Sequence, residues 1–518
     1  MPTLTWLTRN DDLQQAEKAP YRLLEPVPEL SYGDPHSENM LIQGDNLDAL
    51  KALLPYYAGQ VKCIFIDPPY NTRSAFEHYD DNLEHTQWLS MMYPRLELLR
   101  ELLSEEGSLW VTLDDNEAHY FKVICDEVFG RAAYLATCVW QKRYSRENRE
   151  AIGDAHDNIL IYTKSKEKFK NLRNFIPLGE KQKSVYKNPD NDPRGEWQSV
   201  SLLAQGYRPN QMYEIEAPNG RIHVPPPGNC WKVIKSVYES LVKENRIYFG
   251  KDGKGVPRRK EFLSTAKGLV PWTWWPHEEV GHTDESKKEM QILFGKDDTF
   301  STPKPERLLF RILHIATNPG DLVLDSFLGS GTTAAVAHKM GRRYIGIEIG
   351  EHAVTHCVPR LQKVVDGEQG GISQAVNWHG GGGFKFYRLG ETVFDEDGRI
   401  QAAIKFPTLA AHIWFTETKQ PFARQDTQNK DAQNKADSPL LGIYENQAIA
   451  LLYNGILGDK RVNGGNVLTH SLLSYLRSLA PGFTGDWIIY GESSRISSER
   501  LRTEGIAFKQ TPYDIKVR

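Results

Sequence analysis

The chain has 518 residues with 63 Lys and Arg against 67 Asp and Glu, which gives a net charge of −4. This length allows two to four domains and a large buried core. The N-terminus lacks the basic-then-apolar pattern of a signal peptide and no apolar run approaches about 18 residues, which predicts a soluble, cytoplasmic protein. Five scattered cysteines form no Cys-x-x-Cys pair or Cys/His spacing, which is typical of a reducing compartment and predicts no metal site.

Positive charge is concentrated in one part of the chain. Residues 131–270 carry 26 Lys and Arg against 15 Asp and Glu, a local balance of +11. Such clusters supply phosphate contacts in nucleic-acid-binding proteins. The DNA-binding residues predicted there are Lys142, Arg143, Arg146, Arg258 and Arg259, and Trp272, Trp274 and Trp275 follow the last two in the sequence. A solvated charged face beside a small aromatic core explains any single cluster about as well.

The first elements predict an α/β crossover unit after an irregular N-terminal arm. Prolines at positions 20, 26, 28 and 35 break any long helix in residues 1–38. The pattern that follows predicts a strand at 41–44, a helix at 46–54 and a strand at 61–66. The last strand is a short apolar run of the kind that is buried in a parallel sheet.

Residues 67–72, with the sequence Asp-Pro-Pro-Tyr-Asn-Thr, directly follow that strand. Pro68 and Pro69 end the strand and stiffen the turn, because each fixes φ and lacks an N–H. The turn presents the Asp67 carboxylate, the proline carbonyls and the Tyr70 ring at the carboxyl edge of the sheet, where α/β proteins bind ligands. This set suits an exocyclic amino group, whose hydrogens bond Asp67 and a carbonyl while Tyr70 stacks on the base. For this motif alone, a proline turn with a capping Asp and a core Tyr is an equal alternative.

The next segment completes the predicted catalytic half, residues 39–164. A helix at 86–106 has apolar residues at three- and four-residue spacing, which predicts a buried face rather than a ligand site. A strand at 108–113, a helix at 117–129 and a strand at 158–162 follow. Between the first two, Asp114 and Asp115 are expected to cap the helix rather than to reach the rim of the active site.

Residues 165–300 lack the strand–helix alternation and are rich in Pro, Gly, Trp and Lys. Because this segment separates two halves of one α/β pattern, we expect an inserted region. Together with its positive charge, this position predicts a target-recognition region that contacts bases in the major groove.

The second half, residues 301–380, predicts a helix at 304–316, strands at 321–325 and 343–348, and helices at 331–340 and 351–366. Between strand and helix lies a glycine turn, Phe-Leu-Gly-Ser-Gly-Thr-Thr at 327–333, of the type that lets a ligand approach the backbone. No Lys-Ser/Thr follows it, so it is not a phosphate P-loop. An acidic residue at the end of the next strand, Glu348, is suited to bind ribose hydroxyls.

The pattern changes after four glycines at 380–383. A polar run at 425–437 repeats Gln-Asn-Lys and predicts a flexible linker. Residues 438–518 return to strand and helix signals, so 384–518 is predicted to hold a small C-terminal α/β module that contacts a partner or a second copy of the chain.

The Asp-Pro-Pro-Tyr motif followed much later by Phe-x-Gly-x-Gly resembles the β-group DNA amino-methyltransferases, in which the catalytic motif precedes the cofactor motif. More closely, the chain is similar to the modification (Mod) subunits of type III restriction–modification systems, which methylate adenine N6. Those subunits share the extension to Asn-Thr at 71–72, and stretches like 281–285, 287–289 and 303–305 of this chain. The resemblance covers residues 35–370 and implies a Rossmann-like α/β methyltransferase sheet with permuted motif order.

This resemblance implies S-adenosylmethionine as the cofactor. Phe327, Gly329 and Gly331, with Thr332 beside them, are then expected to line its methionine and ribose side, and Asp325 its amino-acid end. By the same resemblance Glu348 binds the ribose, Asp45 lies near the cofactor adenine and Lys304 opens a helix that completes the pocket. Plain structural roles remain open: helix caps for Asp45 and Asp325, and a surface carboxylate for Glu348.

The implied reaction is an in-line methyl transfer to a base flipped out of double-stranded DNA, with Asp67, Pro68, Pro69 and Tyr70 as the catalytic residues. Such a reaction depends on positioning and electrostatics and uses no metal. The resemblance also implies a homodimer and a separate restriction subunit. No endonuclease or helicase motif is apparent in the chain itself.

Three alternatives to adenine methylation remain at this point. N4-cytosine methyltransferases use the same chemistry but more often have Ser at the position of Asp67. Methylation of RNA or of a protein amide is the second alternative; protein glutamine methyltransferases have Asn there. The third is a non-catalytic DNA-binding specificity subunit, whose signature would be a broken motif.

Overall fold

The computed structural model describes residues 3–71, 75–76, 79–80, 84–146, 151–295, 302–395, 400–401, 404–422, 438–453 and 466–511. The chain forms two compact units, one of Met1–Asn174 with Trp272–Arg518 and one of Phe175–Pro271. The inserted unit is narrower than the predicted 165–300. In the described parts of the chain, no helix is long and apolar enough to cross a membrane.

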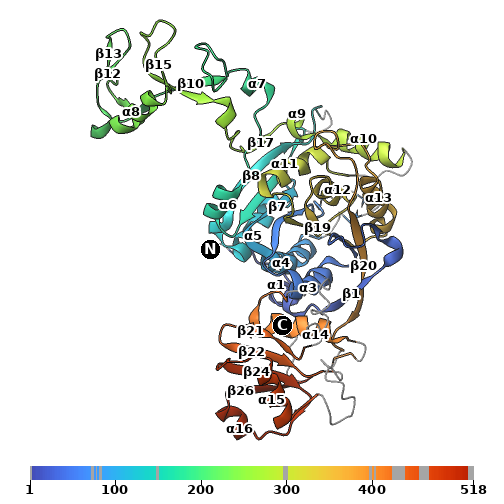
Figure 1. The fold of residues 1–518 in the computed structure, drawn as a ribbon. Coiled ribbons are helices and arrows are strands. Elements are labelled where there is room, and N and C mark those ends of the chain that lie inside the picture. The colour runs from blue at the N-terminus through green and yellow to red at the C-terminus, as the bar shows by residue number, and fades with distance from the viewer. Residues whose placement is uncertain are drawn as a thin grey trace. The chain divides into compact units, whose positions relative to one another are not determined.

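A large mixed sheet forms the centre of the first unit (Figure 1). Its central strands are parallel, and the fold class predicted from the sequence, an α/β sheet with permuted motif order, is confirmed. In spatial order the strands are β1 (Arg22–Pro26), β20 (Gly383–Thr392), β3 (Met40–Gln43), β19 (Arg343–Glu348), β18 (Leu322–Asp325), β4 (Val61–Ile66), β7 (Leu103–Leu113), β9 (His156–Thr163), β8 (Tyr134–Gln141) and β17 (Trp274–Trp275). Strands β18 and β19 lie between β3 and β4, so the two halves of the sequence form one sheet.

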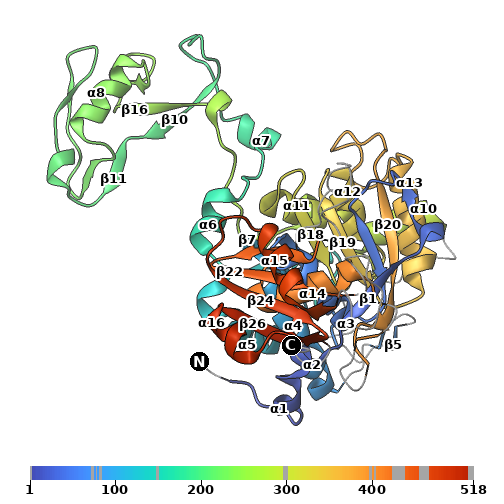
Figure 2. The ribbon, with the colours of Figure 1, turned by 60° about the horizontal axis from the view of Figure 1, so that its bottom comes forward.

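Helices cover both faces of this sheet (Figures 1 and 2). Successive residues of a strand point to opposite faces, and in β4 Ile64 packs in one core while Cys63 and Phe65 pack in the other. The first core also contains apolar residues of α3 (Asn46–Tyr57), α4 (His85–Leu102) and α5 (Ala118–Phe129). The second contains residues of α6 (Lys166–Leu172), α11 (Glu306–Ala316), α12 (Thr332–Lys339) and α13 (Val358–Val365).

Two predicted boundaries at the ends of the sheet are wrong. The N-terminal arm contains α1 (Arg9–Asp12), α2 (Gln15–Lys18) and β1, and β20 belongs to the large sheet rather than to a C-terminal module starting at 384. β20 pairs parallel with β3 and antiparallel with β1. The prolines of the arm do not prevent β1, because β1 is an edge strand and Pro26 is its last residue, where a missing N–H costs little.

Two helices also differ from their predicted bounds. The helix predicted to reach 106 ends at Leu102, because Leu103 continues the leucine spacing but pairs with Val61 as the first residue of β7. The helix predicted at 351–366 consists of a π-helical turn at Ala353–Cys357 followed by α13. Pro359 near the junction cannot donate to the preceding turn, which accounts for the irregularity. Strands β8 and β17 were not predicted.

The inserted unit, Phe175–Pro271, is built from short elements around a small core of Leu202, Ile215 and Trp231. Lys260 is buried there and forms ion pairs with Asp190 and Asp192. Its elements are α7 (Glu180–Lys183), β10 (Trp197–Ser201), β11 (Leu203–Gln205), β12 (Ile215–Glu216), β13 (Ile222–His223), β14 (Asn229–Trp231), α8 (Lys235–Lys243), β15 (Ile247–Tyr248) and β16 (Arg258–Phe262).

The C-terminal residues form a second, smaller sheet in the order β21 (Leu440–Tyr444), β22 (Gln447–Leu451), β24 (Asp486–Gly491) and β26 (Ile506–Gln510). It is flanked by α15 (His470–Ser478) and α16 (Ser498–Thr503), so the predicted strand and helix signals correspond to an α/β module. Helix α14 (Phe406–Thr418) packs on this sheet and also contacts α3. The predicted linker at 425–437 lies entirely outside the described residues.

Candidate active site

Asp67 lies at the carboxyl end of β4, where two neighbouring elements bind its carboxylate. Strands β4 and β7 are parallel with Ile66 opposite Val111, so the next residues, Asp67 and Thr112, also face each other. Thr112 Oγ1 donates to Asp67 Oδ1 at 2.7 Å, and Lys304 Nζ donates to Asp67 Oδ2 at 2.5 Å. The Asp67 side chain keeps 21% of its surface exposed, so it is held in place yet accessible.

The rest of the turn is fixed by α4 and by the start of α5. Trp88 Nε1 donates to the Pro69 carbonyl at 2.7 Å, which leaves the Pro68 carbonyl as the other proline acceptor of the turn. Asn71 has a φ of 58°, a left-handed conformation that Asn tolerates. Its Nδ2 donates at 2.8 Å to Oε1 of Glu117, a residue that is only 2% exposed. Thr72, the last residue of the motif, lies outside the described residues.

Tyr70 is held through its hydroxyl group rather than through its ring alone. The hydroxyl donates at 3.2 Å to Oδ2 of Asp157 in β9, and Lys142 Nζ donates at 2.7 Å to Oδ1 of the same carboxylate. Burial and the Asp157 charge raise the pKa of Tyr70 well above its ordinary value, so the phenol remains a neutral donor. Lys142 also pairs with Asp154 at 2.7 Å. The predicted DNA contact Lys142 is therefore part of the support beneath Tyr70.

Lys304 lies over the turn that contains Asp67 and Tyr70. It precedes α11, and its ammonium nitrogen is 5.0 Å from the ring centroid of Tyr70 and 6.0 Å from that of Trp140 in β8. Trp140 is 1% exposed, and its Nε1 donates to the Gly281 carbonyl at 2.9 Å. The predicted cofactor residue Lys304 thus contacts Asp67, the predicted catalytic residue, in this structure.

The glycine turn follows β18, the strand next to β4. Asp325 Oδ1 accepts from the backbone N–H of Phe327 at 2.9 Å, and Oδ2 accepts from Thr333 Oγ1 at 2.5 Å. Gly331 has a φ of 81° as the N-cap of α12, a conformation that favours glycine. Burial raises the pKa of Asp325 to about 7 despite these two hydrogen bonds, with the charges of Asp67 and Glu348 acting in the same direction. Asp325 therefore fixes the conformation of the glycine turn through hydrogen bonds to both of its ends.

Glu348 is 3% exposed, and protein groups occupy its carboxylate. Oε2 accepts from the Gly329 N–H at 2.6 Å, and Oε1 accepts from the Ile349 N–H at 2.8 Å. His352 Nε2 lies 3.0 Å from Oε1. In this structure Glu348 ties the glycine turn to the end of β19, and its predicted contact with ribose stays a prediction.

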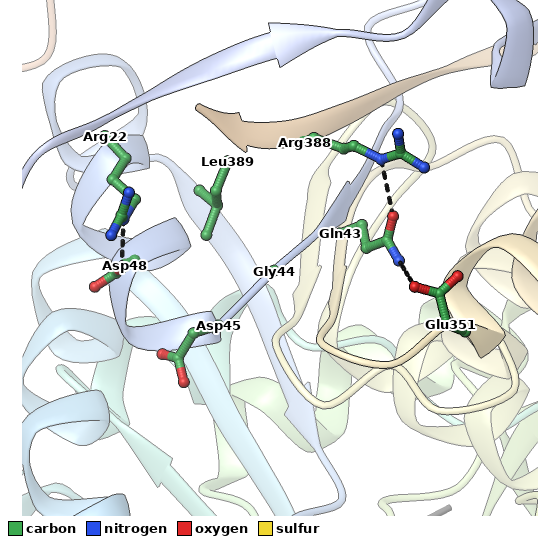
Figure 3. Close-up of a pocket in the computed structure, with 8 residues that line it drawn as sticks. All are labelled: Arg22, Gln43, Gly44, Asp45, Asp48, Glu351, Arg388 and Leu389. Carbon is green, nitrogen blue, oxygen red and sulfur yellow. Dashed lines mark hydrogen bonds and ion pairs between the residues drawn. The ribbon is translucent and has the colours of Figure 1, made fainter. Parts of the chain in front are cut away.

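Asp45 lines an open cavity of about 620 Å³ beside the end of β3 (Figure 3). It caps α3, accepting from Leu47 N–H at 2.7 Å, and Arg95 donates to both of its oxygens, at 3.0 and 3.1 Å. The Asp45 side chain is nevertheless 43% exposed. The other residues that line the cavity are Arg22, Gln43, Gly44, Asp48, Glu351, Arg388 and Leu389.

Thr332 is tied into a buried charged network behind the turn. Arg360 Nη1 donates to Thr332 Oγ1 at 2.8 Å, and Arg360 Nη2 donates to Glu306 Oε1 at 3.0 Å. Lys339 Nζ also binds Glu306, at 2.8 Å. The Arg360 and Lys339 charges keep the pKa of Glu306 below its ordinary value although burial opposes this. This network fixes the start of α12, and thereby the position of the glycine turn.

The residue immediately before the glycine turn has a buried polar atom without a hydrogen-bond partner among the described residues. Ser326 is 2% exposed, and its Oγ has no hydrogen-bond partner among the described residues. Asn46 Nδ2 donates to the Ser326 carbonyl at 2.7 Å and so links the turn to the start of α3, beside Asp45. A buried hydroxyl without a protein partner is a feature that a polar ligand would satisfy.

The remaining predicted DNA contacts lie in two places. Arg143 and Arg146 are exposed on the segment that follows β8, where the exposed Tyr144 stacks on His277 with 5.9 Å between ring centroids. Arg258 and Arg259 belong to β16 of the inserted unit. Arg258 donates to Ser199 Oγ at 2.5 Å and to its carbonyl at 2.9 Å, while Arg259 pairs with Glu261.

The sequence analysis did not predict several residues of this site, and only one of them, Thr112, could have been predicted from a pattern in the sequence. Thr112 could have been found from the strand register once β4 and β7 were paired. Asp157 and Glu117 contact the motif across long stretches of sequence, which no local pattern shows. Asp114, expected to cap the next helix, instead accepts from the Asn116 N–H at 3.0 Å, and burial raises its pKa to about 6.

Comparison with known proteins identifies the family. The model of the DNA methylase family N6_N4_Mtase matches residues 61–358, which is more than half of the chain and includes both the Asp67 turn and the glycine turn. The chain belongs to this DNA methylase family.

The three relatives that follow are proteins of low to moderate identity to this chain, and each is longer than it. It is 35% identical over 336 residues to the StyLTI Mod subunit of a type III restriction-modification enzyme of Salmonella typhimurium, which covers 58% of this chain and 49% of that protein. It is 32% identical over 421 residues to the HindVI Mod subunit of Haemophilus influenzae, covering 70% and 55%. To the EcoP15I Mod subunit of Escherichia coli it is 27% identical over 380 residues, covering 60% and 57%. The chain spans about half the length of the curated relatives that it matches.

Proposed function

We propose that this protein transfers a methyl group from S-adenosylmethionine to N6 of adenine in double-stranded DNA, as the modification subunit of a type III restriction–modification system. The observation that carries the proposal is the pairing of two turns on neighbouring strands. Asp67 and Tyr70 follow β4, and the glycine turn with Ser326 follows β18, so an acceptor for an amino group adjoins a backbone that a cofactor can approach. Membership of the DNA methylase family and the names of the relatives support this assignment.

The residues of the glycine turn and of the cavity at Asp45 fit the cofactor. Ser326 Oγ offers an unsatisfied hydrogen-bonding group, and Asp45, Gln43 and Glu351 line open space. Bound S-adenosylmethionine supplies an electrophilic methyl group on a sulfonium that is its own leaving group. We assign Phe327, Gly329 and Gly331 to its methionine and ribose side and Asp45 to its adenine side.

The contribution of the chain's own residues is to orient the target nitrogen. Asp67 accepts one hydrogen of the exocyclic amino group and the Pro68 carbonyl accepts the other. These two bonds direct the nitrogen lone pair out of conjugation with the ring, which makes the nitrogen nucleophilic. Flipping the base costs a few kcal/mol, and stacking on Tyr70 offsets part of this cost. The base thus enters a site whose acceptors are already in position.

The proposal assigns sequence recognition to the inserted unit, Phe175–Pro271, whose Arg258 and Arg259 lie on β16. The C-terminal residues beyond β20 are assigned to contact with a second copy of the chain or with a restriction subunit. The names of the relatives as Mod subunits of restriction-modification enzymes support a separate partner chain.

The catalytic assignment is tested by Asp67→Ala. We expect methyl transfer from labelled S-adenosylmethionine to duplex DNA to fall by at least a thousandfold, because the amino group loses its charged acceptor. DNA affinity, measured by fluorescence anisotropy, should stay within about threefold of wild type, since phosphate contacts supply most of it. A variant that retains a tenth or more of wild-type turnover would contradict the role of Asp67.

A further inference from the structure

The Lys304 ammonium occupies the part of the site that the target amino group needs. It donates to Asp67 Oδ2 at 2.5 Å, and it lies over the Tyr70 ring, 5.0 Å from the centroid. Only 12% of the Lys304 side chain is exposed, so the ammonium lies inside the site and not at its rim. The proposed reaction uses the same carboxylate to bind the adenine amino group and the same ring to stack on the adenine.

Both oxygens of Asp67 already have a donor. Thr112 Oγ1 donates to Oδ1 at 2.7 Å, from a buried position on β7, and Lys304 donates to Oδ2. An ammonium and an aromatic amine cannot both lie against Oδ2 and over the Tyr70 ring, because each is an N–H donor of similar size. Entry of the base therefore requires that the Lys304 ammonium move away.

We propose that Lys304 is a placeholder for the target amino group: it pairs with Asp67 while no base is bound, and it leaves when the flipped base enters. This inference rests on the proposed function, since the incoming group is the target base of that reaction. The step is an exchange of one hydrogen bond to a carboxylate for another, so Asp67 has a donor on Oδ2 before and after entry.

The local sequence suits such an exchange. Pro303 and Pro305 flank Lys304 and restrict the backbone on both sides, so the backbone of this segment is stiff. A lysine side chain, in contrast, has four rotatable methylene links and carries a compact charge. The ammonium is thus able to withdraw by side-chain rotation alone. Lys304 acts as a positioning residue, because it holds the Asp67 carboxylate in place. Only a base that carries an amino group gives Asp67 a donor to replace Lys304.

The test measures how tightly wild-type enzyme and the Lys304→Met variant bind each of two DNA duplexes. The target adenine is first mapped with wild-type enzyme, and then the affinity for a duplex with that adenine is measured beside a duplex with an abasic site in its place. With the abasic duplex no base enters and Lys304 stays on Asp67. With adenine the base displaces Lys304, so removal of the lysine favours this complex alone. We expect the ratio of the two dissociation constants, abasic over adenine, to rise at least fivefold.

Two control variants isolate the effect. Lys304→Arg keeps a cation that can pair with Asp67, and its ratio should stay within twofold of wild type. Lys288→Met removes one charge from the exposed surface of α10 (Thr283–Phe294) and should change both affinities equally. Thermal unfolding identifies a misfolded variant; if Lys304→Met does not fold, Lys304→Gln takes its place, with the same expected direction.

An unchanged ratio in folded Lys304→Met would overturn the placeholder role, and so would a lower ratio, which would mean that Lys304 contacts the bound base. Calorimetric titration with S-adenosylmethionine addresses the role predicted from the sequence. Weaker cofactor binding with an unchanged ratio assigns Lys304 to the cofactor and overturns the proposal. Failure of the proposed function is distinguishable, because wild-type enzyme would then yield no methylated adenine to map.

Discussion

At the scale of single residues, Asp157 holds Tyr70 and Lys142 in place, although it does not contact the substrate in the proposed reaction. It is 2% exposed and accepts from both the Tyr70 hydroxyl and the Lys142 ammonium. Asp157 and Asp154 raise the pKa of Lys142 although burial acts against this, so the cation persists in the site. A lysine predicted to bind phosphate instead helps to fix the Tyr70 ring, on which the base stacks in the proposed reaction.

Asp157→Asn tests this support. The amide keeps the size of the side chain but removes the charge, so Lys142 retains only the more exposed Asp154. We expect the free energy of unfolding to fall by about 1–3 kcal/mol, measured by urea denaturation. Because Tyr70 is then less well fixed, KM for DNA should rise more than kcat falls. Tyr70→Phe is the matched control, since it removes only the hydroxyl and should cost about 1 kcal/mol. Wild-type stability and KM in Asp157→Asn would show that this support is unimportant.

At the scale of elements, the local sequence predicted those strands and turns whose signals are contained within a few residues. β4 with its proline turn has the bounds expected from an apolar run followed by Pro, and β18 with its glycine turn begins one residue later than the expected 321–325. Strand pairing is a long-range property, and this is why β1 and β20 were assigned to an irregular arm and to a separate module. Likewise, Lys304 meets Asp67 from 237 positions away, and no local pattern could predict that contact.

Asp325, at the end of β18, makes the glycine turn sensitive to pH. Its folded-state pKa of about 7 lies above the ordinary value of 3.8, so the folded protein binds its proton more tightly than the unfolded chain does. The stability contributed by this group is greatest in acid and is lost as pH rises from about 4 to about 7. Asp325→Asn should therefore gain about 2 kcal/mol relative to wild type between pH 5 and pH 8.

Urea midpoints at the two pH values measure this difference. The exposed Asp252 provides a control, because Asp252→Asn should differ from wild type by the same amount at both pH values. An Asp325→Asn variant whose difference from wild type is also constant would contradict the pH-dependent role of Asp325.

At the scale of the whole molecule, two halves of the sequence form one sheet, and the residues of the inserted unit separate these halves along the chain. The parallel pairing of β4 with β18 brings the Asp67 turn next to the glycine turn, although the motifs are far apart in the chain. The sequence motifs predicted this arrangement through their resemblance to a family. The placement of Asp157, Glu117 and Trp88 around them depends on packing between helices and strands, which the motifs do not encode.

Mass spectrometry of nucleosides from DNA incubated with the protein and S-adenosylmethionine is the most direct test of the proposed methyl transfer. We expect N6-methyladenine with wild-type protein and none with Asp67→Ala. N4-methylcytosine in its place would retain the mechanism and contradict the assigned base. No methylated nucleoside from DNA of diverse sequence, although the protein binds the cofactor, would contradict the proposed function itself.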